Sequence, residues 1–187
     1  MMRKTPLALL LLLLVSPCLL AASERSIDPV HSKVTVHVGK AGLFSAAGHE
    51  HEVSAPVAAG AFDDSQASHV WLRIDAARMT VLPEKDQEAV QSAMQKSVLE
   101  SVKFPEIRFE STSIHKIDND KWTITGNLTL HGKTNSITFD VHDEAGTYLG
   151  QARIKQTEFG IQPISVAGGA VKVLNEVKID FVIAAGK

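Results

Sequence analysis

The sequence has 187 residues, of which 44% are hydrophobic and 5% aromatic, and its formal net charge is −2 at pH 7. This length suits one domain with a full-sized core, and the slightly acidic balance lacks the basic excess that nucleic-acid binding requires. The single cysteine, Cys18, lies in the N-terminal segment described next, so we expect no disulfide, catalytic thiolate or cysteine-ligated metal.

Residues 1–22 have the features of a cleaved secretory signal. Residues 3–4 are basic, residues 7–20 form an apolar run broken by a Ser-Pro pair, and residues 21–22 offer small side chains for cleavage. The apolar run is shorter than the length that a transmembrane helix normally needs. We therefore expect an exported chain, periplasmic or secreted, with no transmembrane segment and a single domain over residues 23–187. Its net charge would be −4, because two of the 19 basic residues leave and 21 acidic residues stay.

Two alternatives for this segment remain. The first is a retained N-terminal anchor. The second is a lipoprotein signal that attaches lipid to Cys18, but Pro17 stands where such signals need a small residue.

Beyond the signal, short runs alternate apolar and polar residues, which is the pattern of strands with one buried face. Gly-, Asp- and Asn-rich turns separate them at fairly regular spacing, as expected for an antiparallel sandwich or barrel. The predicted strands are residues 33–38, 57–62, 70–75, 107–111, 122–130, 136–141, 148–154 and 177–183.

The most regular element is a hairpin over residues 121–141. Its two runs place apolar side chains on one face and Thr, Asn, Ser or Asp on the other, and residues 131–135 supply the turn. Only one face of this hairpin is apolar, so we expect that face to lie against other apolar groups.

One segment departs from the strand pattern. Residues 84–99 are rich in Glu, Lys, Gln, Ala and Met, and Val90, Met94 and either Ser97 or Val98 share a helical stripe. We expect an all-β fold with this one helical insertion. Closure into an eight-stranded, lipocalin-like antiparallel barrel would also remove exposed strand edges.

Seven features, in this order, resemble the YceI-like family of exported, lipocalin-like, polyisoprenoid-binding proteins, over nearly the whole mature chain. They are residues 27–34, residues 70–77, Asp86 with the helix that follows it, and residues 104–112, 126–134, 158–161 and 176–179. The resemblance implies an elongated barrel whose apolar interior sheaths an isoprenoid or similar lipid tail, and it supplies no catalytic residue. Many members have a histidine where this chain reads Lys40-Ala41-Gly42, and an arginine near residues 155–157, so head-group contacts do not transfer.

The inward side chains of the predicted strands are the candidate ligand contacts. A filled core that binds nothing is the alternative, because any β-core needs the same alternation. Gly126 and Gly150 interrupt apolar faces, which fits either a cavity or a bend in the strands. The candidates are Val34, Val36, Val38, Leu72, Ile74, Phe109, Ile124, Leu128, Leu130, Ile137, Phe139, Ile154, Ile179 and Phe181.

His49 and His51 form the most distinct polar pair. On a strand they point the same way and are weak candidates for a metal site, which would need a third ligand such as His37 or His131. Contact with a ligand head group at a barrel mouth, together with Phe159, is the other interpretation. We expect the remaining histidines to be ordinary surface residues: His31, His69, His115 and His142.

These features predict an exported binding protein that holds an isoprenoid, quinone or fatty-acyl chain, as a carrier or by sequestration. The first alternative is a metal-binding accessory protein that uses His49 and His51. The second alternative is a lipid-processing enzyme, although the sequence has no G-x-S-x-G elbow, P-loop or H-E-x-x-H motif. We expect no enzyme activity and no cofactor other than a bound lipid, and the sequence leaves a homodimer open.

Overall fold

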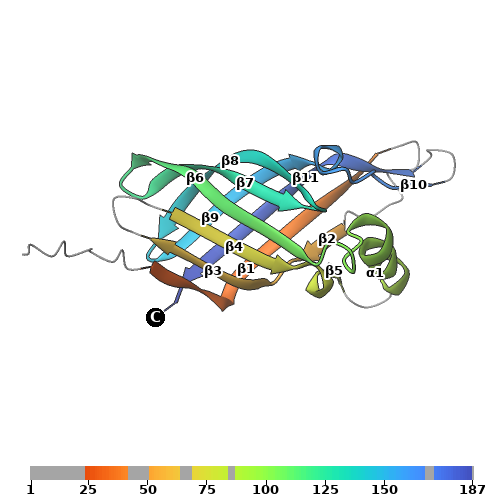
Figure 1. The fold of residues 1–187 in the computed structure, drawn as a ribbon, viewed down its shortest axis with the longest axis horizontal. Helices are drawn as coiled ribbons and strands as arrows, with labels where there is room; N and C mark the ends of the chain where they lie inside the picture. Colours follow the sequence, from red (N-terminus) through yellow and green to blue (C-terminus); the bar gives the residue numbers. More distant parts are fainter. Residues whose placement is uncertain (1–23, 42–50, 64–68, 84–86, 167–170, 187) are drawn as a thin grey trace, which may run out of the picture.

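The computed structural model describes residues 24–41, 51–63, 69–83, 87–166 and 171–186, and its main feature is an elongated antiparallel barrel (Figure 1). Hydrogen-bonded pairing runs β1-β3-β4-β6-β7-β8-β9-β11, and β11 pairs with β1 to close the ring. The predicted all-β, eight-stranded barrel is therefore confirmed. The barrel strands are β1 (Glu24–Ala41), β3 (Val57–Asp63), β4 (His69–Asp75), β6 (Glu106–Asp118), β7 (Lys121–Leu130), β8 (Lys133–Glu144), β9 (Thr147–Lys155) and β11 (Val171–Ala185).

Strand β1 is much longer than predicted and changes partner along its length. Its start pairs with β3 and its second half with β2 (His51–Ser54), which in turn pairs with β5 (Thr80–Leu82). A register shift against β11 separates Asp28 from Lys33. There the Asp28 carboxylate accepts the Val30 N–H at 2.8 Å and bonds His31 Nδ1 at 2.7 Å. The bond to His31 is the main reason that the pKa of Asp28 lies below its ordinary value.

The predicted hairpin is β7 and β8, and its turn is shorter than expected. The turn is only His131-Gly132, at φ 52° and 71°, as the two central residues of a type I′ turn require. Lys133 onward already pairs with β7. On the outer face, hydroxyls bond across the strands, for example Thr129 to Thr134 at 2.8 Å.

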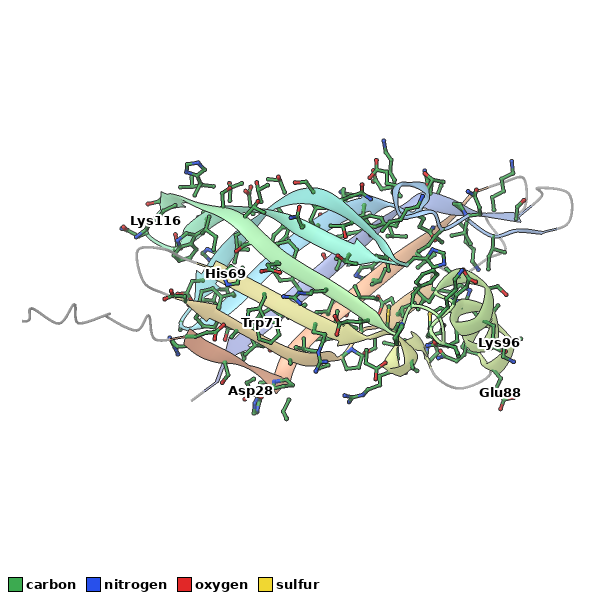
Figure 2. All side chains as sticks on the ribbon, viewed as in Figure 1. Asp28, His69, Trp71, Glu88, Lys96 and Lys116 are labelled. Atoms are coloured by element: carbon green, nitrogen blue, oxygen red, sulfur yellow. The ribbon has the colours of Figure 1, made fainter. Side chains whose placement is uncertain are left out.

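The helical insertion appears where the sequence predicts it and covers one end of the barrel, the helix end (Figure 1). It consists of α1 (Glu88–Ala93) and one π-helical stretch, η3 (Met94–Val98). Val90, Met94 and Val98 line the cavity, although Val90 is also partly exposed to solvent, whereas Ser97 is exposed and does not line it. The opposite end carries the β6–β7 and β8–β9 turns and is called the hairpin end. Figure 2 shows Lys116 near the hairpin end and Glu88 and Lys96 at the helix end, on the outside.

Two glutamines attach the insertion to the barrel. Gln91 Oε1 accepts the Val81 N–H and its Nε2 donates to the Met79 carbonyl, both at 2.8 Å. This amide therefore takes the place of a neighbouring strand at the outer edge of β5. Gln95 Nε2 adds bonds of 3.0 Å to the carbonyls of Ala76 and Met79.

Replacing Gln91 by alanine removes the partner of the Val81 N–H and one of the two side-chain bonds to the Met79 carbonyl, which keeps its bond from Gln95. We expect a loss of about 1–3 kcal/mol in the free energy of unfolding, mainly because the partly buried Val81 N–H loses its bond. Urea titration measures it. Gln87→Ala is the matched control, since Gln87 makes no side-chain capping bond, and an equal loss in both variants would contradict the assigned role.

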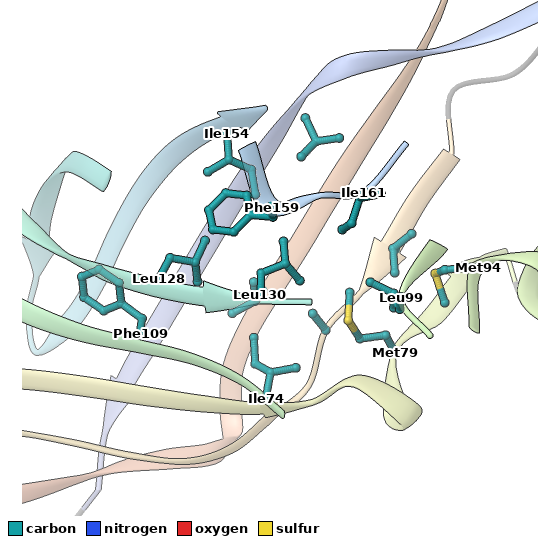
Figure 3. Close-up of a cluster of buried hydrophobic side chains, with 14 of the residues drawn as sticks. Ile74, Met79, Met94, Leu99, Phe109, Leu128, Leu130, Ile154, Phe159 and Ile161 are labelled. Atoms are coloured by element: carbon teal, nitrogen blue, oxygen red, sulfur yellow. The ribbon is translucent and has the colours of Figure 1, made fainter. Parts of the chain in front are cut away.

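Solid packing is concentrated towards the helix end (Figure 3). The short helix η4 (Gln156–Phe159) places Phe159 in this cluster with no exposed surface at all. The chain leaves η4 through Gly160, whose φ of 75° suits a residue without a Cβ. Within the described ranges, no helix combines the length and apolar character needed to cross a membrane.

Candidate ligand-binding cavity

A cavity of about 470 Å³ runs inside the barrel. Its lining includes Phe62 and Tyr148 at the hairpin end and Met94 and Ile161 at the helix end. The volume lies in the range of roughly 300–1,000 Å³ that is usual for small-molecule sites. The apolar faces of the strands therefore enclose a cavity and do not meet as a solid core.

All fourteen predicted inward side chains line this cavity. They come together because alternate residues of each strand face the same side, and closure turns that side inward. That they contact a ligand remains a prediction. They are Val34, Val36, Val38, Leu72, Ile74, Phe109, Ile124, Leu128, Leu130, Ile137, Phe139, Ile154, Ile179 and Phe181.

An aromatic group at the hairpin end also lines the cavity and is absent from the predicted set. The Phe62 and Tyr148 ring centroids lie 5.2 Å apart, and Trp122 lies 6.3 Å from Tyr148. The Arg25 guanidinium lies 5.4 Å from the Phe62 centroid. Alternation was a sufficient signal for Trp122, which shares the inward face of β7 with Ile124.

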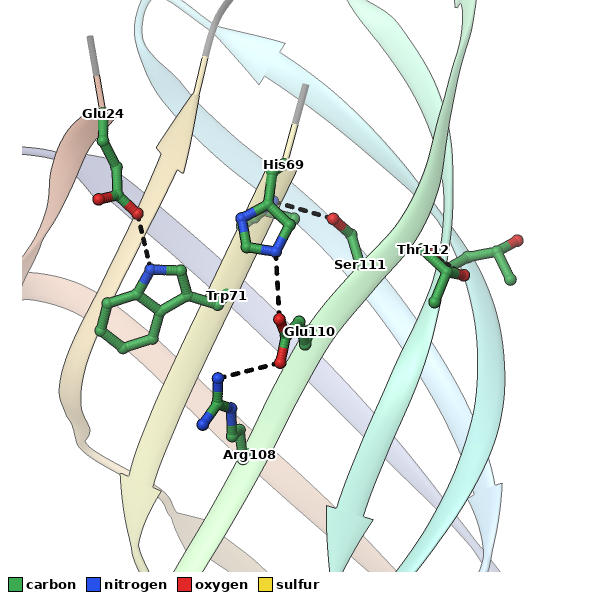
Figure 4. Close-up of polar contacts among 9 residues, drawn as sticks. Glu24, His69, Trp71, Arg108, Glu110, Ser111 and Thr112 are labelled. Atoms are coloured by element: carbon green, nitrogen blue, oxygen red, sulfur yellow. Dashed lines mark hydrogen bonds and ion pairs between the residues drawn. The ribbon is translucent and has the colours of Figure 1, made fainter. Parts of the chain in front are cut away.

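His69 is partly exposed, as the sequence predicts, and it also lies at the rim of the cavity. It borders the cavity at the hairpin end, and its Nε2 lies 3.5 Å from Glu110 on the next strand. Figure 4 shows this contact among the outer-face bonds of the barrel wall, which include Arg108 to Glu110 at 2.9 Å and Trp71 Nε1 to Glu24 at 2.8 Å. Outside the cavity, these bonds join β4 to β6 and, across β3, to the start of β1.

The three predicted mouth contacts have different positions. His49 lies outside the described residues. His51 lines the cavity, at the end covered by the helix, and pairs in register with Val38. Phe159 is not at a mouth: its side chain is fully buried in the core beside the cavity, because η4 turns it inward.

Neither predicted third ligand can join His51 at a metal. Paired residues share a face, so His51 lies inward with Val38, while His37 pairs with Glu52 on the outer face. His131 Nε2 instead bonds Glu100 at 2.7 Å, and its ring stacks 4.3 Å from Phe104. Among the described residues, no group of three or more His, Cys, Asp or Glu side chains could hold a metal.

The outer position of His37 is clear from its partners. Its Nε2 lies 2.9 Å from Asp180, which also bonds Lys178 and Gln151. Burial raises the pKa of Asp180, but the hydrogen bonds from Lys178 and Gln151 outweigh it and leave that pKa below its ordinary value. This group stabilises the outside of the β11 wall.

The sequence model of the YceI-like domain matches residues 26–185. The chain belongs to the YceI-like family. The predicted resemblance is therefore confirmed, and it extends across the whole barrel of this YceI-like domain. Comparison with curated protein sequences gave no match.

Solved structures share the YceI-like barrel at low sequence identity. BcnA of Burkholderia cenocepacia is 22% identical, with a TM-score of 0.62 over 86% of this chain and 99% of its own. A polyisoprenoid binding domain from Saccharophagus degradans, implicated in plant cell wall breakdown, is 15% identical, with a TM-score of 0.58 over 89% and 100%. The Campylobacter jejuni YceI protein is 20% identical, with a TM-score of 0.54 over 68% and 80%. At these identities the likeness establishes the fold.

Proposed function

We propose that this YceI-like protein is a non-enzymatic carrier or sequestering protein that holds an isoprenoid, quinone or fatty-acyl chain in its barrel. The observation that supports this proposal is the apolar cavity of about 470 Å³ that reaches both ends. Its described lining contains no lysine or arginine. The polar side chains Asp63, His69, His51 and Gln156 lie towards the two ends.

Such a lining favours affinity from the tail of the ligand. Burial of an alkyl chain yields about 0.8 kcal/mol per CH₂, so a long tail can bind tightly without a charged anchor. A buried anion without a partner would carry a large desolvation cost. The description of the Saccharophagus degradans domain as polyisoprenoid-binding supports the same ligand class here.

We also propose that the protein acts outside the cytoplasm, in the periplasm or after secretion. The support is the signal-like composition of residues 1–22. An exported lipid carrier needs a sheath, because its ligand is nearly insoluble in water.

The direct test is extraction of the full-length expressed protein, purified without detergent, into organic solvent, followed by mass spectrometry of the extract. We expect a lipid with one long chain, near one molecule per barrel, and reloading of the stripped protein from vesicles. A protein that carries no lipid and takes up none would contradict the proposal. Metal analysis of the same preparation, beside the variant His49→Ala/His51→Ala, is expected to give equal metal content in both.

A further inference from the structure

Three phenylalanine rings form an arc on the cavity wall, about midway along the barrel. Phe109 comes from β6, Phe139 from β8 and Phe181 from β11, and all three line the cavity. The ring centroids of Phe109 and Phe139 lie 5.3 Å apart, and those of Phe139 and Phe181 also lie 5.3 Å apart. We call these three side chains the aromatic arc. It spans five neighbouring strands, from β6 to β11.

Two glycines on the intervening strands make room for the arc. A Cβ at Gly126 on β7 would lie 2.4 Å from Cζ of Phe109, and a Cβ at Gly150 on β9 would lie 2.2 Å from Cζ of Phe181. Carbon atoms in contact normally lie about 3.5–4.0 Å apart. Each outer ring of the arc therefore lies directly against a glycine. The side-chain volume missing at these positions is occupied by phenyl rings and does not enlarge the cavity.

A methyl group at either glycine would have no other place to go. The same Cβ positions lie 2.6 Å from the Glu110 carbonyl oxygen at Gly126 and 2.7 Å from the Asp140 carbonyl oxygen at Gly150. Those oxygens belong to the barrel wall, whereas the phenyl ring borders open space. A methyl group therefore requires a small shift of the wall strand away from the carbonyl oxygen and a larger shift of the ring, which is the end of a side chain and can move only away from the wall, into the cavity.

The cavity continues on both sides of the aromatic arc. Towards the hairpin end it is lined by Trp122 and Tyr148, and towards the helix end by Leu130 and Met94. A ring that swings inward from the wall would therefore narrow the passage between two apolar halves.

We propose that the aromatic arc and its glycine seats, Gly126 and Gly150, set the bore of the cavity, and that the ligand is one long chain that passes the arc and fills both halves. This inference rests on the proposed function and specifies which apolar ligands it serves. A long chain gains contacts in both halves, whereas a short chain fits within one half and does not need the passage. The two glycines are specificity-determining positions.

The test compares two prenols with the same head group, geraniol as the short probe and solanesol as the long one. Their affinities for the stripped full-length protein are measured by competition with a fluorescent fatty alcohol. In Gly150→Ala we expect solanesol affinity to fall at least about tenfold, the equivalent of losing about two buried CH₂ groups, with geraniol unchanged. The double variant Gly150→Ala/Phe181→Ala removes the displaced ring and should recover solanesol binding.

Two further variants separate an effect on the width of the cavity from an effect on the stability of the fold. Gly146→Ala strains a turn glycine, at φ 87°, that has nothing within 4 Å of its Cβ position, so it destabilises the chain without moving a ring and should leave the affinity ratio of the probes unchanged. Phe139→Trp adds bulk to the arc without touching a glycine and should reproduce the selective loss of solanesol. It decides the question if Gly150→Ala does not fold.

The outcomes distinguish this inference from the proposed function. Wild-type protein that binds neither prenol would overturn the proposed function. Wild-type protein that binds both, with variants that weaken both probes equally or neither, would overturn the role of the aromatic arc while leaving the carrier intact. Loss of solanesol binding that Phe181→Ala does not restore would also overturn it.

Discussion

Replacing Leu128 by tryptophan is expected to remove most ligand binding while the barrel stays folded. Leu128 lies on β7 opposite Phe109, is 8% exposed and lines the cavity (Figure 3). In a solid core the added bulk would cost about 1–3 kcal/mol in strain. Here it can extend into open space. We expect affinity for a long-chain ligand to fall about 100-fold, as if about three or four CH₂ groups were displaced.

The matched control is the neighbouring residue on the same strand. Asn127 is exposed on the outer face, so Asn127→Trp adds the same side chain without entering the cavity. Ligand loading by mass spectrometry and circular dichroism are measured for both variants. Full loading of a folded Leu128→Trp protein would show that the cavity is not the binding site, and equal losses in both variants would show a nonspecific effect.

Replacing Phe159 by alanine is expected to have the largest effect on stability. The side chain has no exposed surface and lies in the hydrophobic cluster with Leu130, Ile154 and Ile161. Truncation of a buried phenylalanine typically costs about 3–5 kcal/mol, through lost transfer free energy and the void left behind. The measurement is urea unfolding followed by tryptophan fluorescence.

The comparison variant for Phe159→Ala is Ile124→Ala. Ile124 is also inward, but it is only partly buried and borders the cavity, so it has fewer packing contacts to lose. We expect its cost to be clearly smaller than that of Phe159→Ala. Equal costs for the two variants would indicate that the barrel interior is packed alike throughout, contrary to the cavity.

Much of the barrel could be predicted from the sequence, because strand alternation is a local property. The hairpin of β7 and β8 has apolar residues on one face and hydroxyls on the other, and the structure places Leu128 inward and pairs Thr129 with Thr134 outside. The insertion was recognisable for the same kind of reason, since Val90 and Met94 repeat at helical spacing. The family could be recognised from short segments in the correct order.

The errors arose where the outcome depends on residues far apart in the chain. Alternation assigned Phe159 no partner, yet η4 turns it into the core. His69 is partly exposed, as expected, but its place at the rim of the cavity could not be predicted, because it depends on where its strand begins relative to the other strands. The missing side chain at Gly150 fitted either a cavity or a bend in the strand. The structure shows that Phe181, on another strand, occupies this space.

The sequence alone thus determined which side chains face inward, because a two-residue period depends only on neighbouring positions. Whether those side chains meet in the middle depends on the number of strands, their registers and the placement of three phenylalanines, and these are relations between distant segments. Only the tertiary structure could decide that the centre of this barrel is open.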